Sequence, residues 1–74
     1  MKLFWIARGK YGTLHMFFNR RPICVNGKWK TSEDLGGRYV GELEPHLFPE
    51  VTFENSPQQV ELRLLGKLEK THQD

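Results

Sequence analysis

The sequence has little of what stabilises or anchors many small proteins. Cys24 is its only cysteine, so no internal disulfide can form, which argues against a disulfide-stabilised secreted protein. No apolar run approaches the roughly 20 residues of a membrane-spanning helix. The apolar run near the start is interrupted by Arg8 and does not resemble a signal peptide. We therefore expect a cytoplasmic protein with no membrane partner.

Side chains that perform catalysis or bind metal ions are also few. The three histidines are widely separated, and none stands at metal-ligand spacing from Cys24 or from another histidine. Cys24 lies between two aliphatic residues, where a small buried or half-buried side chain is commoner than a reactive thiol. The two glycine-rich phosphate-binding motifs, GxxxxGK(S/T) and GxGxxG, do not occur. The sequence thus predicts no catalytic residue, no metal ion and no cofactor, and it indicates that the protein is not an enzyme.

Helical periodicity is missing as well, since no segment keeps a 3.6-residue apolar repeat over three turns. The apolar residues instead alternate in short runs separated by turn-forming residues, a pattern typical of antiparallel β-strands. The first run is apolar on both faces, which predicts a central strand. The expected strands cover residues 3–8, 14–18, a hairpin over 23–30, 38–43, 51–54 and 60–65.

We predict an all-β fold, a single antiparallel meander or open barrel of five to six short strands over residues 1–66. Residues 67–74 hold one apolar side chain and are expected to form a flexible C-terminal tail. A single helical turn is expected near 45–48, because proline is tolerated in the first turn of a helix. A core of this size leaves a stability of about 3–5 kcal/mol, which a homodimer interface would increase.

The segment 44–54 is unusually apolar for its length and contains two prolines. Its apolar side chains could form an exposed recognition site, or they could close one end of the sheet. Pro45 fixes its own φ, and Pro49 disfavours the helical region for Phe48. Because this backbone is constrained to a tight corner, we favour the second interpretation, in which Leu47 or Phe48 belongs to the core.

Charge is distributed unevenly along the chain. Residues 1–38 hold eight basic and two acidic residues, whereas residues 39–74 hold three basic and seven acidic residues. Such asymmetry raises the hypothesis of a nucleic-acid partner. Pairing of basic early strands with acidic late strands explains the same pattern without a ligand, and is the simpler interpretation.

A short basic and aromatic segment is the strongest candidate for a binding site. Trp29 stands between Lys28 and Lys30, and Arg20 and Arg21 precede this hairpin. A ring flanked by cations can stack on a base while the cations contact phosphates, so the set predicts a weak single-stranded nucleic-acid site. Alternatively, Trp29 packs on the core and the lysines protect an edge strand from pairing.

The aromatic content suggests a further possibility. Phe4, Trp5, Phe17, Phe18 and Phe48 are many aromatic residues for one side of so small a core. Any that are exposed indicate a protein partner or a homodimer interface. We therefore expect a small non-enzymatic binding or protein-interaction module. Nucleic-acid binding is one alternative, and an accessory subunit or inhibitor of an enzyme is another.

Two separated stretches of the sequence share a recognisable pattern. An aromatic-Ile-Ala-Arg strand leads into a glycine-containing turn, and a Leu-Phe-Pro-Glu-Val-aromatic segment precedes a Val-x-Leu strand. The pattern resembles a group of short uncharacterised proteins of Bacteroides-type gut bacteria and their mobile elements. This resemblance implies a bacterial, cytoplasmic protein, and it assigns no catalytic or ligand residue. The matching residues are Trp5 to Arg8, Gly12 to Leu14, Leu47 to Phe53, Pro57, Val60 and Leu62.

Overall fold

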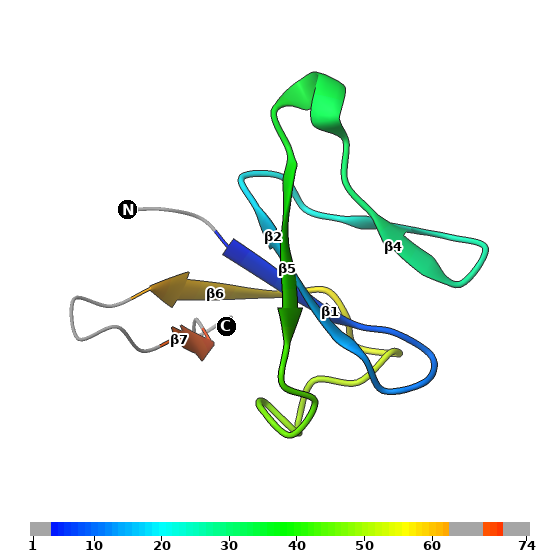
Figure 1. Cartoon of the computed structure of the whole chain (residues 1–74), viewed down its shortest axis with the longest axis vertical. Helices are drawn as coiled ribbons and strands as arrows, with labels where there is room; N and C mark the ends of the chain where they lie inside the picture. Colours follow the sequence, from blue (N-terminus) through cyan, green and yellow to red (C-terminus); the bar gives the residue numbers. More distant parts are fainter. Residues whose placement is uncertain (1–3, 63–67, 71–74) are drawn as a thin grey trace.

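Short strands make up nearly all the regular structure of the computed structural model, which describes residues 4–62 and 68–70. The prediction of an all-β fold is confirmed (Figure 1). Within the described residues the elements are β1 (Phe4–Arg8), β2 (Leu14–Phe18), β3 (Ile23–Val25), β4 (Lys28–Lys30), the 3₁₀-helix η1 (Glu33–Leu35), β5 (Arg38–Leu43), β6 (Gln58–Leu62) and β7 (Leu68–Lys70).

Five of these strands form one antiparallel sheet in the order β5-β2-β1-β6-β7, so β1 is central, as its two apolar faces predicted. The β1–β2 hairpin forms the middle of the sheet, and Ile6 lies opposite Met16 in it. Gly12 has a φ of 95 in the loop that connects the two strands. β5 then pairs with β2 on one side, and β6 pairs with β1 on the other. The resulting sheet is open and does not close into a barrel.

One face of this sheet carries the main core. Ile6, Leu14, Met16 and Val60 point to this face and are buried, as the alternation in the strands predicted for Val60. Val51 reaches the same cluster from the long connection between β5 and β6 and is fully buried. This connection therefore covers the core face of the sheet and supplies part of its packing.

The opposite face of the sheet lies beneath the separate β3–β4 hairpin. Its turn has Asn26 at φ 52 and Gly27 at φ 76, the positive values of the predicted type I′ turn. Cys24 is opposite Trp29, as predicted from a two-residue turn. Trp29 points toward the sheet, where its indole N–H donates a hydrogen bond to the carbonyl of Arg8. The chain thus forms layers on both faces of one sheet.

The helical turn lies at Glu33–Leu35 and not near 45–48, where it was predicted. Gly36, at φ 91, ends this turn and donates its N–H to the carbonyl of Glu33 at 3.0 Å. At 45–48 the chain instead makes a tight turn, which ends with Phe48 at φ 50. The proline that follows Phe48 disfavours the helical region there, which accounts for the difference.

The expected strand over 51–54 is a turn in the structure. The Thr52 N–H donates to Asn55 Oδ1 at 2.8 Å, and the Asn55 N–H donates to Thr52 Oγ1 at 3.1 Å. These side chains satisfy backbone groups that a strand would pair with a neighbour, so the segment needs no strand partner. Val51 still points inward, as expected.

Residues 68–70 contribute to the sheet. Leu68–Lys70, within the segment predicted to be a flexible tail, forms β7 and pairs with β6 in antiparallel register. The alternation of apolar residues did not predict β7, because β7 is held by pairing with the backbone at the edge of β6. The predicted strand over 60–65 begins earlier, at Gln58, and its residues 63–65 lie outside the described part of the chain.

Arg8 ties the β5–β6 connection to the end of β1. Arg8 is the arginine of the aromatic-Ile-Ala-Arg strand. Most of the carbonyl groups that accept hydrogen bonds from its side chain belong to the Leu-Phe-Pro-Glu-Val segment. These two stretches, far apart in the sequence, are therefore parts of one structural unit. All five guanidinium N–H groups have the geometry to donate to carbonyls. The acceptors are the carbonyl oxygens of Gly12 at 2.8 Å, Pro45 at 2.9 Å, Leu47 at 2.9 Å, Phe48 at 3.1 Å and Val51 at 2.5 Å.

Candidate ligand-binding groove

Two adjoining hollows lie between the β3–β4 hairpin and the sheet, on the face opposite the main core. They have volumes of about 360 Å³ and about 370 Å³, and His15 and Trp29 line both. We call them together the Trp29 groove. Aromatic rings and cations dominate its lining. The rings are Tyr11, Phe17, Trp29 and Tyr39, and the cations are Lys10, Lys28 and Lys30.

Trp29 forms a rigid wall of the groove. Its Nε1–H donates to the carbonyl oxygen of Arg8 at 3.0 Å, so the polar edge of the indole is satisfied by the protein. The ring also meets Phe53 edge-on, with 6.1 Å between the ring centroids. These contacts fix the orientation of a half-buried ring that still lines both hollows. A flat ligand can therefore stack on Trp29 without reordering the side chain.

His15 and Tyr39 form the floor of the groove. His15 Nδ1 lies 3.2 Å from the Tyr39 hydroxyl oxygen, and the Tyr39 ring packs on Phe17 with 5.3 Å between centroids. Burial, and next the nearby Glu42 carboxylate, raises the pKa of the Tyr39 hydroxyl above its ordinary value. The hydroxyl thus stays protonated at neutral pH and can donate to His15. Tyr39 is 50% exposed, which leaves much of it open to a ligand.

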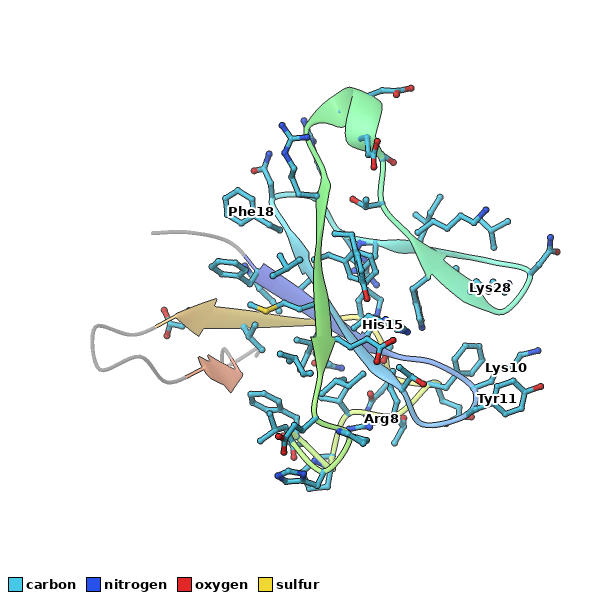
Figure 2. All side chains as sticks on the ribbon, in the orientation of Figure 1. Arg8, Lys10, Tyr11, His15, Phe18 and Lys28 are labelled. Atoms are coloured by element: carbon cyan, nitrogen blue, oxygen red, sulfur yellow. The ribbon has the colours of Figure 1, made fainter. Side chains whose placement is uncertain are left out.

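The tips of two hairpins meet at one end of the groove. Figure 2 shows Lys10, Tyr11 and Lys28 together at this end of the molecule. Lys10 lies against the β3–β4 turn so closely that a Cβ on Gly27 would stand 2.8 Å from its Cε. Tyr11 is 97% exposed at the tip of the β1–β2 loop. The ring of Tyr11 is therefore open to contact with a ligand beside the two lysines.

The structure divides the five predicted nucleic-acid residues into two groups. Lys28, Trp29 and Lys30 line the groove. Arg20 instead donates its Nε–H to the carbonyl oxygen of Leu35 at 2.6 Å, and the Arg21 guanidinium lies over the Trp5 ring, 5.7 Å from its centroid. Neither arginine is among the residues that line the groove. Both have local partners that explain their position.

The groove also contains residues that the basic hairpin alone did not indicate. Lys10 and Tyr11 come from the first loop, and His15 shares its strand face with the buried Phe17. Tyr39 comes from β5, and a register shift in the β2–β5 pairing places it opposite Phe17. Period-two alternation predicts which residues share a face but not which strands become neighbours, so this grouping requires the three-dimensional structure.

Several negative findings concern the residues that the structure describes. They include no group of three or more His, Cys, Asp or Glu side chains placed to hold a metal ion. No described helix is long and apolar enough to cross a membrane. Cys24, expected to be buried or half-buried, is exposed, because β3 belongs to a separate two-stranded sheet in which all three of its residues are exposed.

The chain was also compared with known proteins. No family model, no curated protein and no solved structure matches it. The chemistry of the Trp29 groove is therefore the basis for a functional proposal.

Proposed function

We propose that the protein is a small non-enzymatic binding module that takes single-stranded nucleic acid in the Trp29 groove. The observation that supports this most is the arrangement of Trp29, Tyr11 and Tyr39 with three lysines around the two adjoining hollows of the groove. Stacking of a base on an aromatic side chain contributes about 1–3 kcal/mol and tolerates any sequence. Lysines on both sides of the rings would follow the phosphates, which is how sequence-tolerant single-strand binders work.

A single strand suits this site better than a duplex. Trp29 is half-buried between the two hollows, where an unstacked base can reach its ring more readily than a base held inside a duplex. The described residues include no helix longer than the three-residue η1, so they offer no helix to enter a major groove. The three lysines would supply a modest electrostatic contribution, consistent with weak binding that depends strongly on salt.

A protein partner is the second candidate, because β5 is an edge strand with exposed Tyr39 and Val40. This edge is poorly suited to pairing with another strand. The register shift in the β2–β5 pairing leaves Val40 as an extra residue, and such bulges hinder the addition of another strand. The groove lining holds three lysines and one acidic residue, Glu33, and this excess of positive charge also favours an anionic ligand. We therefore regard nucleic acid as the better-supported ligand.

The proposal predicts that the double substitution Lys28→Gln/Lys30→Gln weakens binding to a dye-labelled oligothymidylate. We expect about a tenfold loss at low salt, because two phosphate contacts disappear. The slope of log affinity against log salt should become shallower by about 1.4, since each single-strand contact contributes about 0.7. Fluorescence anisotropy over a salt series measures both quantities.

The matched control removes the same charge elsewhere. Arg21→Gln/Arg38→Gln also deletes two cations, but these side chains are not among the groove lining. At about 0.1 M salt, screening over roughly 10 Å should leave affinity and slope almost unchanged. Equal losses in the two double variants would show that only net charge matters, and absence of binding by the unmodified protein at low salt would remove the proposal.

A further inference from the structure

We propose that acidification tightens nucleic-acid binding through His15, whose protonation adds a cation to the floor of the Trp29 groove and reverses its hydrogen bond with Tyr39. This inference rests on the proposed function and concerns the regulation of the same site. It starts from the position of His15, which is half-buried and lines both hollows of the groove. Histidine is the side chain that ordinarily changes charge between about pH 5 and 8.

The hydrogen bond between His15 and Tyr39 has two directions. In the neutral tautomer with Nδ1 unprotonated, the Tyr39 hydroxyl donates to His15 Nδ1 across 3.2 Å. When a proton from solvent binds Nδ1, the imidazolium N–H donates and the Tyr39 oxygen accepts. The hydroxyl hydrogen is then free to turn into the groove and donate to a phosphate or to a base carbonyl. Protonation thus adds both a charge and a donor for an anionic ligand.

Charged groups of both signs surround His15. The carboxylate of Glu42 stands directly opposite His15 in the β2–β5 pairing, on the same face of the sheet. Glu33, at the rim of one hollow, adds a second negative charge. Lys28 and Lys30, on β4, contribute positive charge.

Lys10, in the β1–β2 loop, contributes positive charge as the two lysines of β4 do. Burial, and next Glu42, raises the pKa of the Tyr39 hydroxyl, so this phenol stays neutral in the acidic range. A bound phosphate backbone would offset the three lysines. By linkage, ligand binding should therefore promote proton uptake, and proton uptake should promote ligand binding.

The other histidines supply internal controls. His46 is exposed, and its Nδ1 lies 3.3 Å from Oε2 of Glu44. It belongs to the β5–β6 connection and is not among the groove lining. His72 lies outside the described residues. A pH effect that depends on the groove should follow His15 and neither of these residues.

The experiment measures the anisotropy of rhodamine-labelled oligothymidylate at about pH 8 and about pH 5.5, where thymine and phosphodiesters do not titrate. The unmodified protein should bind about fivefold more tightly at the lower pH, the effect of one partly exposed charge contact. Its salt slope should steepen by about 0.7, the contribution of one added cation. His15→Gln should abolish both changes, whereas His46→Gln and His72→Gln should retain them.

The outcomes separate this inference from the proposed function. Binding of equal strength at both pH values, or a pH response that persists in His15→Gln, would overturn the role of His15 and leave the proposed function intact. Absence of binding at both pH values would overturn both. Tyr39→Phe should keep the change in salt slope but lose part of the tightening, because the charge remains and the donor is gone. An unaltered response in Tyr39→Phe would contradict the reversal of the hydrogen bond.

Discussion

Replacement of Arg8 by lysine is expected to lower the free energy of unfolding by about 3 kcal/mol or more, which is most of the stability of a domain this small. The guanidinium group of Arg8 donates to five backbone carbonyls spread over the β1–β2 loop and the β5–β6 connection. A lysine ammonium group has three donors at one point and cannot reach acceptors arranged around a planar fork. The unsatisfied carbonyls of the connection would then favour its release from the core.

Urea unfolding followed by far-ultraviolet circular dichroism measures this loss. Arg38→Lys is the matched control, because Arg38 is exposed on β5 and the same change should cost less than about 0.5 kcal/mol. If Arg8→Lys were as stable as Arg38→Lys, the hydrogen bonds of Arg8 would not hold the connection in place.

Replacement of Phe48 by alanine should have the second large effect, a loss of about 3 kcal/mol in unfolding free energy. Phe48 is half-buried and packs against the core cluster formed by Ile6, Leu14 and their neighbours. Truncation removes this apolar contact and leaves a cavity at the end of the sheet. The expected loss is comparable with the total stability, so much of the variant should be unfolded in buffer.

The adjacent Leu47 is an internal comparison for Phe48. Its side chain is 38% exposed and is not part of the core cluster. Leu47→Ala should therefore cost about 1 kcal/mol or less. If the two alanine variants lost equal stability, or if Phe48→Ala lost none, Phe48 would not be a core residue and its role in recognition would have to be reconsidered.

Local patterns predicted the strands well where one rule was sufficient. Asn26-Gly27 tolerates positive φ at both residues, and it alone determined the pairing of Cys24 with Trp29. The first strand, apolar on both faces, is central in the sheet. Prediction was wrong over 51–54, where the side chains of Thr52 and Asn55 satisfy the backbone and replace strand pairing.

The groove was only partly predictable, because its residues meet through tertiary contacts. The sequence indicated Trp29 and its flanking lysines, since a ring between cations is a local pattern. It did not indicate that Arg20 would donate to the Leu35 carbonyl, or that Tyr39 would lie beside His15. Those contacts depend on the turn at η1 and on the register shift in the β2–β5 pairing, neither of which has a sequence signal of its own.

The central claim is that single-stranded nucleic acid occupies the Trp29 groove. The most direct test is a titration of ¹⁵N-labelled protein with oligothymidylate, followed by two-dimensional NMR. We predict that the largest shift changes occur at Tyr11, His15, Tyr39 and the indole N–H of Trp29. Absence of changes at saturating ligand, or changes confined to the separate hollow lined by Phe4, Phe18, Arg38 and Val40, would contradict the account.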